Sequence, residues 1–526
     1  MRSPVSFLRW LSLSILLGLT NLASANDFDI PYTEKTLDNG LRVIVHEDNK
    51  APVVAVNIWY HVGSKNEKPG KTGFAHLFEH LMFNGSENYP GEYFEPFKQV
   101  GATGQNGTTN FDRTNYFQNV PKTALDMALW MESDRMGHLL GAITQESLDT
   151  QRGVVQNEKR QGENQPYGRV FNHIVKAMFP EGHPYHWLPI GSMEDLNAAS
   201  LEDVTEWFKT YYGPNNAVLV IAGDVTPEEG FAKAEKYFGD IPPGPPISKH
   251  SVWVPKLTGK HREILQDRVP EARIYKLWTA PNWASADADA LGLIGDLLAS
   301  GKTSRLYERL VYRDQIATSV SASPFFAEIA GTMIITASVQ PGGDVAAVEA
   351  AIDEELQRFL DKGPTRDELK RVKTQYRASL IRGVERIGGF GGKSDILAEN
   401  AVYGGSPDFY KTSLQRVEAA TPKSLLAVAR KWLSTDDNYV LEVQPFVEGS
   451  ASTEGADRSA VPMPDSFPSV QFDNFERGTL SNGLKLIVTQ RDAIPVVSMQ
   501  LIMDAGYAAD QFAEPGTSSL AMSMLD

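Results

Sequence analysis

Residues 71–83 read KTGFAHLFEHLMF, a stretch that contains two histidines and a glutamate. If this stretch is helical, His76 and His80 lie one turn apart on one face, so both imidazoles can reach a single cation. Two neutral imidazoles without thiolates suit Zn²⁺, and a carboxylate beside the metal, here Glu79, can take a proton from an attacking water. The alternative is a core helix with two hydrogen-bonded histidines, but burying two imidazoles and a carboxylate without a common partner is costly.

A catalytic zinc ion keeps three protein ligands, so a third is required. Further along the chain, SLDTQRGVVQNEKRQ predicts a helix that carries Glu158. HLFEH followed by VVQNE at this distance resembles the pitrilysin and insulinase family of zinc metallopeptidases, the inverzincins, whose motif is His-x-x-Glu-His. The resemblance implies an endopeptidase that cleaves peptides or small unfolded proteins. In it His76, His80 and Glu158 bind one Zn²⁺ ion, and Glu79 is the general base.

A second stretch, GATGQNGTTNFDRTNY at 101–116, resembles the edge strand with which the family holds its substrate by backbone pairing. The resemblance places Asn106, Gly107 and Thr109 near the scissile bond. There is also one departure from the family pattern. The family often has a glutamate seven residues before the distal ligand as support for a ligand histidine, and this chain has Gln151. Because an amide supplies no charge, we expect a change in metal affinity or in rate.

The order of patterns predicts repeated domains. Two alternating, β-branched segments from residue 33 predict strands before the 71–83 helix, and residues 116–160 are expected to be helical. The resemblance implies an α+β fold: repeated α/β domains, each with a mainly antiparallel sheet packed by helices, forming one half of a clamshell. The expected divisions are a signal segment at 1–25, a catalytic zinc-binding domain at 26–245, a homologous non-catalytic domain at 250–447, a linker at 448–474 and the truncated start of a third, motif-less domain at 475–526.

An internal repeat underlies the last of these divisions. GTLSNGLKLIVTQRDAIPVVSMQLIMDAG aligns with KTLDNGLRVIVHEDNKAPVVAVNIWYHVG at a constant offset, since 480 − 37 = 443 for Leu480 and Leu37. The same offset puts serine or methionine where the first copy has its site residues, so the second copy lacks the metal site. We expect a longer parent protein with two homologous halves, whose missing half, or a homologous subunit, would close over the substrate. The replacing residues are Ser519, Met522 and Ser523.

The first residues predict export. Arg2 and Arg9 flank a short apolar core, and Ala23-Ser24-Ala25 is a small-residue cleavage site, so we expect cleavage after Ala25 and a periplasmic or secreted protein without a stable membrane anchor. The chain has 0 cysteines, which suits an oxidising compartment and excludes disulfides and thiolate ligands.

Composition narrows the function classes. A hydrophobic content of 42% supports several cores, and a net charge of −16 argues against a nucleic-acid partner. A peptide substrate remains the expected partner. Two alternatives stay open: a peptide-binding or assembly protein that has kept the fold and lost catalysis, and a truncated enzyme that needs its second half.

Overall fold

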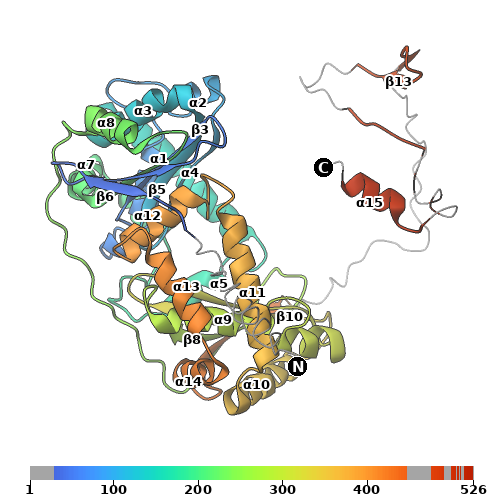
Figure 1. Ribbon diagram of the computed structural model, residues 1–526. Helices are drawn as coiled ribbons and strands as arrows, with labels where there is room; N and C mark the ends of the chain where they lie inside the picture. The colour runs from blue at the N-terminus through green and yellow to red at the C-terminus, as the bar shows by residue number, and fades with distance from the viewer. Residues whose placement is uncertain are drawn as a thin grey trace, which may run out of the picture. The chain divides into compact units, whose positions relative to one another are not determined.

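The computed structural model describes residues 29–446, 475–490, 499–504, 506, 508, 510 and 514–524. The chain divides into two compact units, residues 1–448 and 449–526, which we describe separately (Figure 1). The predicted signal segment at 1–25 lies outside the described residues, as does the whole of the predicted linker at 448–474. Among the described helices, none combines the length and apolar character needed to cross a bilayer.

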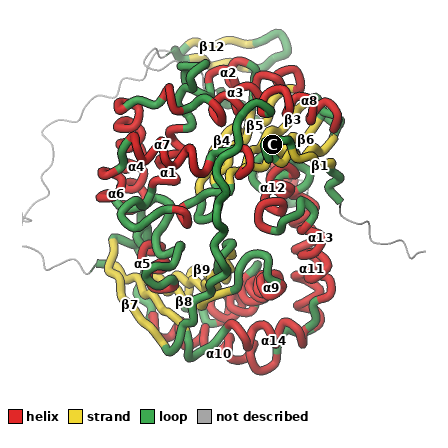
Figure 2. The backbone as a smooth tube through the Cα atoms, turned by 90° about the vertical axis from the view of Figure 1, so that its left-hand side faces the viewer, coloured by secondary structure: helices red, strands yellow, loops and turns green. Residues whose placement is uncertain are grey.

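The first unit contains a six-stranded sheet, drawn in the upper part of Figure 2. It is antiparallel except where β2 and β6 run parallel. In spatial order its strands are β1 (Thr33–Thr36), β2 (Arg42–Glu47), β6 (Ala217–Gly223), β3 (Val53–Tyr60), β5 (Thr114–Pro121) and β4 (Thr103–Thr109).

Both faces of the four inner strands are buried, whereas the edge strands β1 and β4 are largely exposed. Alternate residues of a strand point to opposite faces. One face packs in a large core with α1 (Phe74–Leu81), α3 (Leu125–Gly137), α7 (Leu201–Tyr211) and α8 (Pro227–Phe238). The opposite face packs against α12 (Lys393–Tyr403), which comes from the later part of the same unit. The remaining helices of this region are α2 (Glu95–Gln99), α4 (Gln145–Asn164), α5 (Val170–Met178) and α6 (Met193–Ala198).

The second sheet has five strands in an equivalent order without a counterpart of β1, and it lies in the lower part of Figure 2. Here α9 packs as α1 does in the first sheet, but it carries no histidine. The strands in order are β7 (Lys260–Asp267), β11 (Asn438–Pro445), β8 (Arg273–Ala280), β10 (Gly331–Val339) and β9 (Ala317–Phe326). The helices are α9 (Ala286–Ala299), α10 (Val345–Lys362), α11 (Arg366–Gly383), α13 (Phe409–Ala419) and α14 (Pro422–Trp432).

The structure corrects one expectation of secondary structure. Residues 116–160 were expected to be helical, yet Thr114–Pro121 is strand β5, paired with β3 on one side and β4 on the other. The reason is that β5 is buried on both faces while carrying polar residues. Gln118 lies in this strand and donates a 2.8 Å hydrogen bond to the buried Glu132 of α3, so the usual apolar and polar alternation is absent.

The second unit reproduces the beginning of the first at an offset of 443 residues. It holds β12 (Glu476–Thr479), β13 (Lys485–Val488) and α15 (Thr517–Ser523). Glu476 pairs with Val488, and subtracting 443 from both gives Thr33 with Val45, a pair found between β1 and β2. The sequence repeat is therefore a repeat of strand register as well.

Candidate metal centre

Helix α1 presents the two motif histidines on one face because its other face is apolar. Phe74, Leu77, Phe78 and Leu81 are buried in the core of the first sheet. The imidazoles of His76 and His80 turn away from that core, and their Nε2 atoms lie 3.3 Å apart. The one-turn spacing expected from the sequence is present in the structure.

Helix α4 brings the third predicted ligand to the same place. Its Leu148 and Val155 are buried in the same core as α1, which fixes the two helices against each other. The Oε2 atom of Glu158 lies 3.4 Å from His80 Nε2 and 3.7 Å from His76 Nε2. One ligand atom from each of the three residues lies within 4.8 Å of the other two.

These separations fit a zinc ion. Protein N and O ligands bind Zn²⁺ at about 2.0–2.2 Å in a tetrahedron, which separates neighbouring ligand atoms by about 3.3–3.6 Å. The observed separations run from 3.3 to 3.7 Å. Two unprotonated imidazole nitrogens and a carboxylate oxygen facing one another repel unless a cation lies between them. The donor set therefore fits a divalent metal.

Burial also prepares the first histidine for a metal. Burial, together with the nearby His80 ring, lowers the pKa of His76 to about 4. The imidazole is then neutral near pH 7, as metal ligation requires. Within the described part of the chain, the outer His76 nitrogen, Nδ1, is buried without a hydrogen-bond partner.

Glu79 lies on the same helix but its carboxylate turns to the edge strand. Only 6% of the residue is exposed, and the hydroxyl of Thr109 on β4 donates a 2.6 Å hydrogen bond to its Oε2. Burial raises the pKa of Glu79 to about 7, although Thr109 and the Arg113 charge act in the opposite direction. Such a carboxylate can take up and release a proton near neutral pH.

Strand β4 forms the outer edge of the first sheet. Among the described residues no strand pairs with its free side. Asn106 pairs with Phe117 and Gly107 with Tyr116, so the three residues predicted to bind substrate all belong to this strand. At Gly107 a Cβ atom would lie 2.5 Å from Phe83 Cζ, so glycine permits the strand to approach the end of α1.

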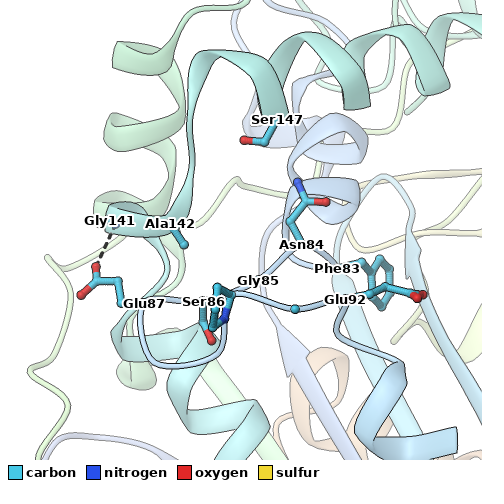
Figure 3. A pocket seen from close by; sticks show the side chains of 11 residues that line it. Phe83, Asn84, Gly85, Ser86, Glu87, Glu92, Gly141, Ala142 and Ser147 are labelled. Carbon is cyan, nitrogen blue, oxygen red and sulfur yellow. Dashed lines mark hydrogen bonds between the residues drawn. The ribbon is translucent and has the colours of Figure 1, made fainter.

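The predicted supporting residue takes a different partner. The Gln151 amide donates a 3.1 Å hydrogen bond to Asn84 Oδ1, not to a histidine. Asn84 in turn lines a cavity of about 700 Å³, which Phe83 and Ser147 also line (Figure 3). The effect of Gln151 on the metal thus stays a prediction.

Two residues at the start of α1, Glu67 and Trp187, were not predicted from the sequence. Glu67 is buried and accepts hydrogen bonds from the backbone at the start of α1 and from the indole of Trp187. The one sequence feature that points to Glu67 is an acidic residue, Asp510, at the equivalent position of the repeat. The sequence does not show which groups Glu67 contacts.

Two family models and several known proteins match this chain. The family model described as Insulinase (Peptidase family M16) matches residues 42–185, and the model described as Peptidase M16 inactive domain matches residues 198–376. The zinc protease PqqE of Helicobacter pylori is 30% identical over 412 residues, which are 75% of this chain and 90% of that protein. The chain belongs to the insulinase family. The predicted family membership is confirmed.

Another curated relative and two solved structures extend the likeness. A probable mitochondrial-processing peptidase subunit beta of Schizosaccharomyces pombe is 26% identical over 373 residues, 68% of this chain and 79% of that protein. Among solved structures, a protease from Helicobacter pylori superimposes with a TM-score of 0.73 at 26% identity, covering 80% of this chain and 100% of that one. The periplasmic protease PqqL from Escherichia coli gives 0.66 at 19% identity, covering 89% and 56%. The predicted fold, a clamshell half with antiparallel-dominated sheets, is confirmed.

Proposed function

We propose that this protein is a zinc-dependent metalloendopeptidase that hydrolyses peptides or small unfolded proteins. The observation that carries the proposal is the convergence of His76, His80 and Glu158, with the Glu79 carboxylate beside them and an unpaired strand edge at hand. The relatives named zinc proteases support the same assignment.

In the proposed reaction, an extended peptide adds a strand to the free edge of β4. Backbone hydrogen bonds along Asn106, Gly107 and Thr109 would hold it, which favours extended shape over a particular sequence. Glu79 takes a proton from the attacking water and passes it to the leaving amine, and Thr109 orients that carboxylate. His76, His80 and Glu158 would hold the zinc ion, which when bound would supply Lewis-acid chemistry at the peptide carbonyl.

We place the protein in the periplasm. Two observations support this location: the predicted signal segment at 1–25, and the likeness to PqqL, which is described as a periplasmic protease.

A second candidate function is peptide binding without turnover, because part of the chain matches the inactive-domain model. That match covers residues 198–376, whereas the candidate metal ligands and Glu79 lie before it, within the insulinase match. The metalloendopeptidase is therefore the better-supported function.

The test is hydrolysis of a mixed peptide library by residues 26–526, with and without a zinc chelator, beside the variant Glu79→Gln. We expect chelator-sensitive cleavage by the parent. The variant should bind zinc and lose activity by about 100-fold or more, since general base catalysis contributes roughly that much. Cleavage by Glu79→Gln at the parent rate would refute the mechanism. Binding of peptides by the parent without any cleavage would favour the second candidate, unless adding a homologous second half restored turnover.

A further inference from the structure

The start of helix α1 is held by a buried carboxylate outside the helix. Glu67 accepts a 2.8 Å hydrogen bond from the Ala75 amide and a 3.1 Å bond from the Gly73 amide. The indole Nε1 of Trp187 donates a third bond, 2.8 Å long, to the same carboxylate. The first amides of a helix have no partner within the helix, so Glu67 satisfies donors that would otherwise be unpaired.

The chain around this carboxylate has little freedom. Gly73 caps the helix with a φ of 86° and offers no side-chain cap of its own. A Cβ atom on Gly191 would lie 2.3 Å from Gly73 Cα, so the two backbones are in direct contact. On the other side, Asp195 accepts 2.9 and 2.6 Å hydrogen bonds from the amide and hydroxyl of Thr72. The start of α1 therefore contacts two other parts of the chain, one at Glu67 and one at residues 191–195.

The second unit repeats this contact without the metal residues. Asp510 lies at the position of Glu67, since 67 + 443 = 510, and accepts 3.0 Å hydrogen bonds from the amides of Gly516 and Ser518. Those two residues are the counterparts of Gly73 and Ala75. A carboxylate at this position therefore holds the helix start in both units, and aspartate makes the two backbone contacts as glutamate does.

We propose that Glu67 is a positioning residue of the metal centre. The proposal rests on the function proposed above. The Ala75 amide, which donates to Glu67, lies immediately before His76, the first ligand. Without the Glu67 carboxylate the amides of Gly73 and Ala75 lose this partner, and the first turn of α1 can fray. Fraying would move His76 relative to His80 and Glu158. Groups that orient metal ligands in this way commonly change metal affinity by 10–100-fold when removed.

The test measures zinc affinity by competition with a chelator, together with kcat and KM, for Glu67→Ala, Glu67→Gln and Glu67→Asp. We expect the alanine variant to bind zinc about 10-fold more weakly. The fold-decrease in its kcat should be larger than the fold-increase in its KM. The glutamine variant should be weakened about 3-fold, because one of its two terminal atoms donates instead of accepting. The aspartate variant should stay within about 2-fold of the parent, as the contacts of Asp510 indicate.

The matched control is Asp510→Ala, which removes the equivalent cap from a helix without ligands and should leave zinc affinity unchanged. Parent-like zinc affinity and kcat in a folded Glu67→Ala protein would overturn the proposal, as would equal weakening by Asp510→Ala. If the alanine variant does not fold, equal zinc affinities for the aspartate and glutamine variants overturn it. Failure of the parent to bind zinc would refute the proposed function instead, so the two failures are distinguishable.

Discussion

The hydroxyl of Thr109 lies 2.6 Å from the carboxylate of Glu79 and joins the edge strand β4 to α1, the helix that carries the candidate metal ligands His76 and His80. The two residues are thirty positions apart in sequence, and each comes from an element with its own role. The strand proposed to bind the peptide is therefore in contact with the group proposed to activate water. Binding and proton transfer can be aligned by this one contact.

Removal of the Thr109 hydroxyl should lower activity. Thr109→Val keeps the shape of the side chain, and we expect kcat to fall about 10-fold, the scale of a hydrogen bond to a charged group. Thr109→Ser should retain most of the parent kcat. Thr108→Val is a neighbouring control, because the Thr108 hydroxyl donates to Asn115 and accepts from Arg113 but does not bond Glu79. Steady-state kinetics would contradict the role if the valine variants at 108 and 109 behaved alike.

The close approach of β4 to α1 should depend on the glycine at 107. In Gly107→Ala the added Cβ would meet Phe83 Cζ at 2.5 Å and Tyr116 Cδ1 at 2.9 Å, so the strand or the ring must shift. We expect kcat/KM to fall about 10-fold or more and the protein to lose about 1–3 kcal/mol of stability. Zinc affinity should be nearly unchanged.

A glycine substitution with open space around it provides the control for this change. Gly292 lies in α9, and apart from its chain neighbours and the backbone of its own helix, no heavy atom of the described residues lies within 4 Å of its added Cβ. Gly292→Ala should leave kcat/KM unchanged and stabilise the helix by about 1 kcal/mol. Comparable loss of activity in both variants would mean that crowding at Phe83 is not the cause.

Glutamate at position 151 should tighten zinc binding. Gln151 now donates to Asn84 Oδ1, and among the described residues Asn84 Nδ2 has no partner. In Gln151→Glu, a flipped Asn84 amide can donate to the new carboxylate, and the added negative charge favours the cation. We expect zinc affinity, measured by chelator competition, to rise about 3-fold or more.

The control for Gln151→Glu adds the same charge elsewhere on helix α4. Gln156 bonds the side chain of Asn197, and Gln156→Glu places a carboxylate on another face of the helix. Its zinc affinity should stay near that of the parent. An equal rise in both variants would indicate a general charge effect rather than one specific to position 151.

An ion pair between the two sheets of the first unit should give a pH-dependent stability. Glu328, in the loop between β9 and β10, bonds His61 at 2.7 Å and pairs with Lys65. Burial alone would raise the pKa of Glu328, but the His61 hydrogen bond and the Lys65 charge outweigh burial and lower it to about 2.

Because the folded pKa of Glu328 lies below its ordinary value of 4.5, its stabilisation is complete above that pH and is lost as pH falls towards 2. Glu328→Gln should therefore lower the free energy of unfolding at pH 7 by ~3 kcal/mol, seen as a lower thermal midpoint, and the difference from the parent should become small near pH 2. The control Glu206→Gln breaks an exposed pair with Lys68 and should have little effect at any pH. A constant difference across the pH range would exclude the ionised pair as the cause.

Part of the candidate site could be predicted because its information is local. The spacing of His76 and His80 needs only the period of a helix, and the repeat at offset 443 needs only a comparison of the chain with itself. The role of Glu158 required the family resemblance, since nothing local connects it to the histidines. Its place beside them results from the packing of Leu148 and Val155 against the core of α1.

By itself, then, the sequence determined that one helix carries a pair of histidines and a carboxylate, that a strand-like segment follows it, and that the beginning of the chain recurs without those residues. Tertiary structure alone decided that Thr109 meets Glu79, that Glu67 and Trp187 hold the start of α1, and that Thr114–Pro121 is a strand. The difference arises from how far apart in the sequence the interacting residues lie. Helical periodicity is set by neighbours along the chain, whereas strand pairing and buried polar contacts join distant residues that only the packed core brings together.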